Sequence, residues 1–416
     1  MIKLSNILSI NNPSDDAVSH YVLQQGIACT MGQLMLSMDF VLVDELGTHY
    51  PVHLEPLAFW PDQSIRWLQL NSIIALPAHA QHTFSLHQSV NKVRASQSFS
   101  NIDVNNNVQI HCADEVIQIN HTGITLGQWS LDFSVIFARV NKTTFTVKSI
   151  KEYHSHVPLF CEIQCAIHAC SDTQQVTNEL TIRVVYTTAE MRIETVLHNP
   201  SPAHHPNGTW DLGDTNSVYI EHWGGQLKVL SATHVITTQL TSDSTYLNDQ
   251  ELHLQQLSSG GQHWDSDAHI DHSLSSPIRY ASALINNEES SINRIEPTVK
   301  IAQPNALWFC QLTHFWQKFP STLRLSQSNK HSLIDWGFHS SAIAPLNELQ
   351  PGERWQRTLL LNHSPCTASA EITVTLNPDY LSMTGALELF HQQQLDSPVH
   401  SLLAQGLTSD AHYFNK

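Results

Sequence analysis

Two segments, Glu179-Leu-Thr-Ile-Arg-Val-Val-Tyr186 and Glu190-Met-Arg-Ile-Glu-Thr-Val-Leu-His-Asn199, decide the fold of this 416-residue chain. Apolar and polar residues alternate along both segments, which is the period of a strand with one buried face. Their β-branched residues favour a half-buried sheet. We therefore predict two long antiparallel strands here.

The same alternation continues on both sides of these segments and defines a large domain. We predict an antiparallel β-sandwich over residues 96–365, built from two curved sheets packed face to face. Its expected strands lie near residues 108–112, 115–120, 133–140, 143–150, 159–167, 179–186, 190–199, 218–223, 226–230, 323–326, 332–336 and 358–363.

Shorter strands fill the N-terminal region. Residues 50–60 and 65–74 alternate and are joined by the turn sequence Trp60-Pro-Asp-Gln-Ser. Several short strands without a helical pattern predict a small barrel or sandwich, which we assign to residues 1–95. The polar stretch 88–107 has the composition of a linker. The chain is thus predicted to be all-β.

The residue pattern changes after residue 365, and we assign residues 366–416 to a C-terminal tail. Residues 378–391 form the best helical candidate of the chain, although Gly385 weakens it, and a second short helix is expected near Leu402. About 50 residues rarely form a stable core alone. We expect this tail to dock on the sandwich, pair with another chain or be irregular.

The charge of the chain limits its partners. Its 20 basic and 37 acidic residues give a formal net charge of −17, which argues against nucleic acid and anionic membranes. Uncharged sugars remain suitable partners, and an acidic polysaccharide would need a local basic site. The sequence has neither a bilayer-spanning apolar run nor a secretory signal at its start, so a complete chain would be cytoplasmic.

The segment 198–217 is the main candidate for a binding or catalytic loop, because its prolines and glycines exclude regular structure. His204 and His205 are candidate general bases. Asp211 and Asp214 could hold a Ca²⁺ ion, or could lock the loop by accepting backbone N–H bonds. Further ligand-binding candidates are Trp210, in the same loop, His263 and Trp264, in a polar excursion at 241–275, and Trp316. The seven cysteines contain no CxxC pair, and we interpret them as reduced and mostly buried.

Three stretches resemble the exo-rhamnogalacturonan lyase family. Residues 57–68, containing Trp-Pro-Asp-Gln-Ser-Ile-Arg-Trp-Leu, resemble the signature of its N-terminal RIFT barrel, with Gln63 where the family has glycine. Residues 198–214 resemble a loop of its central β-sandwich. Phe315-Trp-Gln-Lys-Phe-Pro320 and Glu348-Leu-Gln-Pro-Gly-Glu-Arg354 resemble the end of that sandwich. The resemblance implies a RIFT-type barrel followed by the sandwich.

The resemblance also implies a third domain after the sandwich. Family members continue into an α/α-toroid that supplies most of the catalytic cleft, and here only the partly helical tail comes after residue 365. The tail could be a remnant of that toroid, and a separate α/α-toroid chain is then an expected partner.

Three functions agree with these observations. The preferred one is a carbohydrate-binding β module that binds a polysaccharide or oligosaccharide without turnover of its own. The second is an active lyase or hydrolase with its site around 198–217, where β-elimination on a uronate would need a carboxylate neutraliser, a base and an acid. The third is an assembly scaffold in polysaccharide metabolism, because a fold does not fix a function.

Overall fold

The structure is a computed structural model of the full chain. It describes residues 2–35, 39–89, 99–103, 106–112, 115–137, 140–204, 214–230, 235–241, 244, 247, 251–258, 269–270, 277–278, 282–303, 306–328, 330–340, 347–363 and 372–386. The chain divides into two compact units. Unit 1 comprises residues 1–96, 154–157 and 371–416, and unit 2 comprises residues 97–153 and 158–370.

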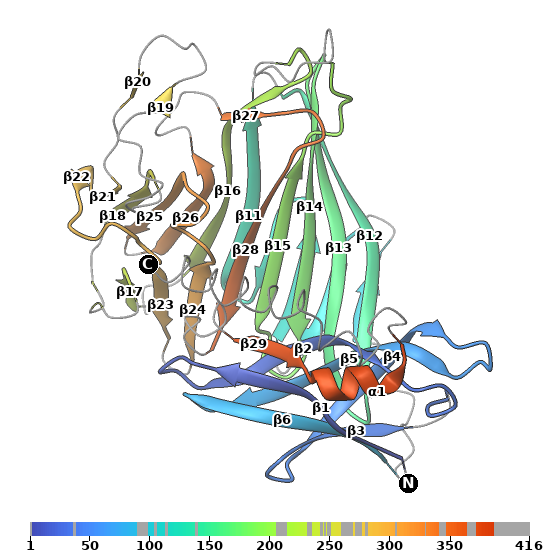
Figure 1. The fold of residues 1–416 in the computed structure, drawn as a ribbon. Helices are drawn as coiled ribbons and strands as arrows, with labels where there is room; N and C mark the ends of the chain where they lie inside the picture. The colour runs from blue at the N-terminus through green and yellow to red at the C-terminus, as the bar shows by residue number, and fades with distance from the viewer. Residues whose placement is uncertain are drawn as a thin grey trace. The chain divides into compact units, whose positions relative to one another are not determined.

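Unit 1 is a nearly closed barrel to which both ends of the sequence contribute (Figure 1). Its strands are hydrogen-bonded in the order β2-β5-β4-β3-β6-β1-β29. The last of these comes from the tail and pairs antiparallel with β1. The bounds are β1 Lys3–Asn12, β2 Val18–Ala28, β3 Phe40–Asp44, β4 His49–Phe59, β5 Ile65–Leu76, β6 Ala80–Gln88 and β29 Thr373–Leu376.

The one helix of the described chain, α1 (Pro378–Thr384), completes this unit. The side chain of Asn377 caps its start and Gly385, at φ 63°, ends it, so the predicted helix stops at the glycine that weakened it. Tyr380 is buried in the barrel core, and its hydroxyl donates to the carbonyl of Ala28 at 2.6 Å. None of the placements expected for the tail included the N-terminal barrel.

The turn that resembles the RIFT-barrel signature lies between β4 and β5. The amide of Gln63 donates to the carbonyl of Trp60, and Gln63 itself has a φ of 68°. This left-handed conformation is the one that glycine adopts without strain, which explains the glycine of the family pattern. The guanidinium of Arg66 stacks 4.7 Å from the Trp60 ring.

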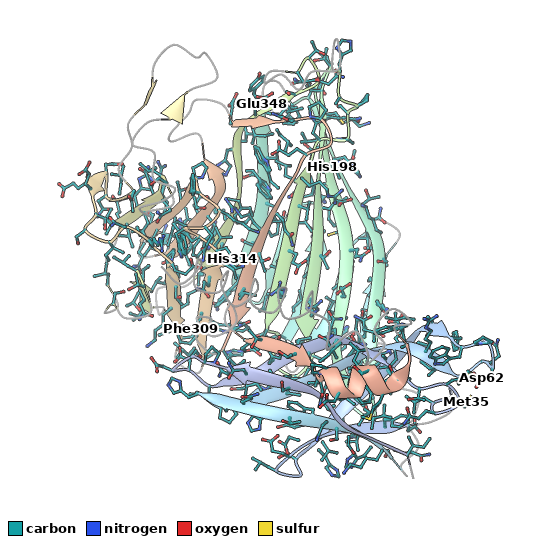
Figure 2. The ribbon with its side chains drawn as sticks, viewed as in Figure 1. Met35, Asp62, His198, Phe309, His314 and Glu348 are labelled. Atoms are coloured by element: carbon teal, nitrogen blue, oxygen red, sulfur yellow. The ribbon has the colours of Figure 1, made fainter. Side chains whose placement is uncertain are left out.

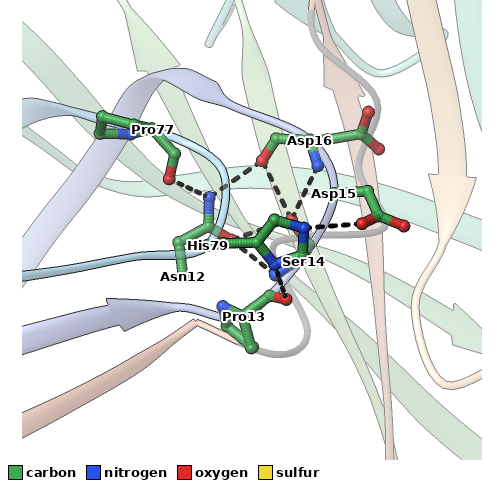
Figure 3. A network of polar contacts seen from close by, with 7 residues as sticks. All are labelled: Asn12, Pro13, Ser14, Asp15, Asp16, Pro77 and His79. Atoms are coloured by element: carbon green, nitrogen blue, oxygen red, sulfur yellow. Dashed lines mark hydrogen bonds and ion pairs between the residues drawn. The ribbon is translucent and has the colours of Figure 1, made fainter.

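A polar network around the buried Asn12 closes the connection from β1 to β2 (Figure 3). The Asn12 amide donates to the carbonyls of Asp16 and Pro77, both at 2.9 Å, and the Asn12 carbonyl oxygen accepts from the Ser14 hydroxyl at 2.9 Å. Asn12 is completely buried, so these bonds satisfy a side chain that would otherwise destabilise the barrel.

Unit 2 is the predicted large antiparallel sandwich. In the described residues its small sheet has eight strands and its large sheet has 12. The small sheet runs β12 Lys142–His154, β13 Pro158–Cys170, β14 Gln175–Val185, β15 Met191–His198, β28 Arg354–Asn362, β24 Leu307–Leu312, β23 Thr298–Ala302 and β17 Val235–Gln239. The large sheet runs β22 Glu288–Glu289, β21 Ala283–Ile285, β18 Glu251–Gln256, β25 Ser321–Gln327, β26 His331–Ser340, β16 Val218–Leu230, β11 Trp129–Phe137, β10 Gly123–Leu126, β9 Glu115–Asn120, β8 Val108–Cys112 and β7 Ser100–Ile102, with β27 Asn347–Leu349 beside β16. A separate pair is formed by β19 His269–Ile270 and β20 Pro277–Ile278.

One continuous apolar core lies between the two sheets of the sandwich. Strands β14 and β15 contribute alternate residues to it, as the alternation in the sequence predicted: Ile182 lies opposite Ile193 and Val184 lies opposite Met191, and all four are in this core. The opposite face of the small sheet therefore carries the polar residues of these strands. His198, labelled in Figure 2, is the last residue of β15 and one of them.

Strand β16 differs from its prediction. Two strands were expected on either side of Gly224 and Gly225, but one strand runs through both, with an irregularity between Trp223 and Gly224. A Cβ at Gly224 would lie 2.5 Å from the carbonyl of Trp336, so glycine allows close strand packing here.

The all-β fold class is confirmed, with a barrel, a sandwich and a short C-terminal helix. In the described residues no helix has the length and apolar character needed to cross a membrane. The six cysteines in the same residues are free, and five of them are buried; Cys366 lies outside them.

Candidate functional site

The candidate loop leaves the small sheet at His198, the last residue of β15. The next residue, Asn199, is buried, and its amide donates to the carbonyls of Asn216 at 2.9 Å and Leu349 at 3.1 Å. One side chain thus holds both ends of the loop against β27. The two ends of the loop are therefore held next to each other by hydrogen bonds.

Asp214 has the geometry of a loop-locking residue. One of its carboxylate oxygens accepts from the amide of His204 at 2.7 Å, and the other accepts from the amide of Asn216 at 2.8 Å. The imidazole of His204 is exposed. In the described part of the chain no group of three or more histidines, cysteines, aspartates or glutamates could hold a metal ion. Asp211, the other Ca²⁺ candidate, lies outside that part.

Four of the other candidates lie outside the described residues, namely His205, Trp210, His263 and Trp264. Trp316 is described: it is half-buried, and the Arg294 guanidinium stacks 4.3 Å from its ring. Its chemistry is therefore that of a cation–π pair at the surface.

A pocket of about 380 Å³ opens on the small sheet. It lies beside the first residues of β28, which extend beyond the end of the neighbouring strand β24. It lies between the two segments that resemble the end of the family sandwich, since Lys318 and Phe319 come from one and Arg354 comes from the other. Trp355 forms another wall, and its indole N–H donates to Glu353 at 2.7 Å. The complete lining is Trp223, Lys318, Phe319, Arg354, Trp355, Gln356 and Arg357.

The three cations of this pocket are held differently. Arg357 is buried, and its guanidinium donates to the carbonyls of Phe338 and Lys318, which ties the large sheet to the 313–320 turn. Among the described residues no carboxylate pairs with it, and burial lowers its pKa to about 9. The Lys318 ammonium donates to the carbonyl of Gln356 at 3.0 Å, and burial, followed by the Arg357 charge, lowers its pKa.

Arg354 also belongs to a charged row on the polar face of the small sheet. The Glu179 carboxylate accepts from the Lys148 ammonium at 2.8 Å on one side and from Arg354 on the other. His198 lies directly opposite Arg354 in the register of β15 and β28. Burial and the Arg354 charge lower the pKa of His198, against the opposing effect of Glu179, so its imidazole is neutral at pH 7.

Residue-level reasoning missed the residues that form this pocket. Lys318 and Arg354 were part of the motifs that resemble the family, but they were not singled out as site residues. The sequence could have indicated them as anion-binding candidates, because both are basic and an acidic chain needs basic residues to bind an anion. Nothing in the sequence distinguishes Arg357 as a site residue, because it lies two positions after Trp355 within the strand β28.

The turn that carries Lys318 is held by a largely buried carboxylate. Glu296 accepts the Phe315 amide at 3.1 Å, and the amides of His314 and Trp316 also donate to it. Burial outweighs these bonds and raises the pKa of Glu296 to about 7. The folded chain therefore binds the Glu296 proton more tightly than the unfolded chain does.

This gives a pH-dependent stability. The stabilisation that Glu296 contributes to the folded state is fully present below pH 4.5, the pKa of this group in the unfolded chain. It is lost as the pH rises through about 7, the pKa in the folded chain. We expect Glu296 to make the free energy of unfolding of the wild type fall by on the order of 3 kcal/mol between pH 4.5 and 8. Chemical denaturation of the Glu296→Gln variant over the same pH range should show no such fall. Parallel pH profiles for the two proteins would contradict this assignment.

Comparisons with known proteins support the barrel. Residues 14–90 match the family described as PcRGLX-like N-terminal RIFT barrel domain. This confirms the RIFT barrel that the sequence resemblance implied. No curated protein matches the chain.

Several solved structures resemble the chain at low identity. A galactose mutarotase-like protein from Clostridium acetobutylicum is 8% identical, with a TM-score of 0.36 over 63% of this chain and 97% of that chain. An α-mannosidase from Enterococcus faecalis V583 is 10% identical, with a TM-score of 0.41 over 89% of this chain and 46% of that chain. A glycosyl hydrolase family 38 protein from Enterococcus faecalis is 9% identical, with a TM-score of 0.39 over 93% and 47%. The chain spans less than half the length of the two Enterococcus structures.

Proposed function

We propose that this chain is a carbohydrate-binding β module, related to polysaccharide lyases, that binds an acidic sugar in the pocket on the small sheet. One observation carries the proposal: three cations and two half-buried aromatic rings line one pocket, between the segments that resemble the lyase family. The proposal includes no turnover by this chain alone.

The chemistry of the pocket suits a uronate. A volume of about 380 Å³ is within the usual range for small-ligand sites. The rings of Phe319 and Trp355 offer an apolar surface for a sugar face, while Lys318 and Arg354 offer donors for a carboxylate. The described lining contains no acidic residue; Arg354 pairs with Glu179, which lies outside it.

The positive charge of the pocket can attract an acidic sugar although the chain as a whole is negative. A chain of net charge −17 repels an acidic polysaccharide at long range. At about 0.15 M salt this repulsion is screened beyond roughly 8 Å, whereas contacts inside the pocket are less screened. A short acidic oligosaccharide is therefore a suitable ligand.

Calorimetric titration tests the proposal with trigalacturonate as the acidic probe and maltotriose as the neutral trisaccharide. We expect saturable binding of trigalacturonate that weakens as salt increases, because the pocket attracts the ligand by charge. Trigalacturonate that fails to bind at millimolar concentration, or binds no better than maltotriose, would count decisively against an acidic-sugar pocket.

A second candidate function, β-elimination, is favoured by the position of His198. A neutral imidazole beside Arg354 could take the C5 proton of a uronate whose carboxylate faces the guanidinium. The C4–O bond would then break, and the Lys318 ammonium could protonate the leaving oxygen.

Elimination is measured by the ultraviolet absorbance of the unsaturated product. If the wild type produces it, with or without added Ca²⁺, we expect His198→Asn to reduce the rate by at least about 100-fold. A flat trace from the wild type with uronate polymers under both conditions would leave binding as the function, and full activity in His198→Asn would exclude His198 as the base.

A further inference from the structure

A second pocket, of about 480 Å³, lies on the large sheet and shares no residue with the pocket at Lys318. It is formed by the outer face of β18 and β25 and by the tip of the β21–β22 hairpin. Its lining is Glu251, Leu252, His253, Asn286, Asn287, Arg324, Leu325 and Ser326. Neither acidic-sugar binding nor β-elimination at the first pocket makes use of it.

The register of the sheet sets the outward side chains of this pocket. Arg324 lies opposite His253 on β18 and opposite Asp335 on β26. Within β25, Leu323 and Leu325 are buried in the core, so Arg324 and Ser326 project from the other face. The floor is therefore a rigid sheet.

The hairpin tip forms a fixed wall. Asn286 and Asn287 have φ values of 52° and 68°, as the two-residue hairpin turns between neighbouring strands require. Asn286 is joined to the backbone of His253 twice, through its side-chain oxygen and its own amide, each at 2.8 Å. The tip therefore cannot move without breaking both bonds.

His253 orients the second asparagine of the tip. Its Nε2 lies 3.1 Å from the Gln255 amide nitrogen, and it also makes a side-chain hydrogen bond to Asn287. Burial and the neighbouring Arg324 charge lower the pKa of His253, so it is neutral at pH 7. His253 is thus a positioning residue.

The remaining polar groups of the pocket are available to a ligand. In the described part of the chain the side chains of Glu251, Arg324 and Ser326 make no hydrogen bond or ion pair. One guanidinium and one carboxylate give a net charge of zero, in contrast to the three cations, and no carboxylate, that line the first pocket. A mixture of donors and acceptors without net charge matches a ligand rich in hydroxyl groups.

We propose that this pocket binds an uncharged hexopyranose, with Arg324 and Asn287 donating to hydroxyl oxygens and Glu251 accepting from hydroxyl groups. The size fits, since small-ligand pockets usually measure roughly 300 to 1,000 Å³. This inference rests on the proposed carbohydrate-binding function for its ligand class and adds a separate site with a different preference. A chain with both sites would bind two parts of a mixed polysaccharide.

Saturation-transfer NMR on the full chain tests this site with D-galactose, D-glucose and D-mannose as separate probes. We expect at least one hexose to bind, and Arg324→Met to weaken it at least about tenfold. Asn287→Gly should also weaken binding while keeping the turn, because glycine accepts a positive φ. Lys330→Met, which removes an exposed cation outside the pocket, is the matched control and should bind as the wild type does.

Each result has one interpretation. Absence of binding for all three hexoses overturns the proposal, as does binding that both Arg324→Met and Asn287→Gly retain. Inorganic phosphate that displaces the hexose at Arg324 would make the pocket an anion site and would also overturn it. Trigalacturonate binding, measured on the same proteins, reports on the first pocket, so failure there is distinguishable from failure here.

Discussion

Replacing both Lys318 and Arg354 with methionine is expected to weaken trigalacturonate binding at least about 100-fold. Hydrogen bonds to charged groups contribute about 1.5 to 3 kcal/mol each, and the variant removes two donors from one pocket. Methionine keeps most of the apolar length of each side chain, so the aromatic wall remains. Calorimetric titration at one salt concentration measures the loss.

The matched control changes the same amount of charge elsewhere. Lys148 and Lys330 are exposed cations outside the pocket, and their replacement by methionine also lowers the net charge by two. Lys148 is particularly informative, because it pairs with the same Glu179 carboxylate as Arg354 does. Equal losses in the two double variants would mean that only the overall charge matters, and the pocket assignment would fail.

The second large effect is expected from the tail. Tyr380→Ala should destabilise unit 1 by about 3 kcal/mol or more, because it removes a buried aromatic ring and leaves a cavity in the barrel core. It also removes the hydroxyl that donates to Ala28. Hydrogen exchange followed by mass spectrometry should show faster exchange in β1 and β2, with little change in the sandwich.

Tyr380→Phe separates the two parts of this effect. It keeps the ring and loses only the hydrogen bond, so a loss of about 1 kcal/mol is expected. If Tyr380→Ala left exchange in β1 and β2 unchanged, the helix would not be part of the barrel in solution. Uniformly faster exchange in both units would instead show that the two units unfold together.

Much of the fold was predictable because the signals are local. The alternation in β14 and β15 identified strands and their buried faces, since a half-buried strand must place apolar residues at every second position. A helix beginning at Pro378 was also predicted, but it was expected to reach residue 391, whereas α1 ends at Thr384 with Gly385 as its cap. The path of β16 through Gly224 and Gly225 was not predictable, because it depends on the carbonyl of Trp336, a residue more than 100 positions away.

The candidate site was less predictable for the same reason. The loop at 198–217 is conspicuous in sequence, and Asp214 has the loop-locking contacts that were one of its expected uses. The pocket depends on residues from the 313–320 turn and from β28, and the sheet register brings them together. A local motif shows that Lys318 and Arg354 are present, but it cannot show that Arg357 holds the turn beside them.

The pairing of β29 with β1 has a consequence for synthesis. The ribosome makes β1 before β29, and the strand that covers the edge of β1 appears about 360 residues later. During that time the barrel has an open edge, which is a surface prone to incorrect strand pairing. The sandwich strands all emerge in the interval, so the barrel begins to be translated before the sandwich and is completed only after it.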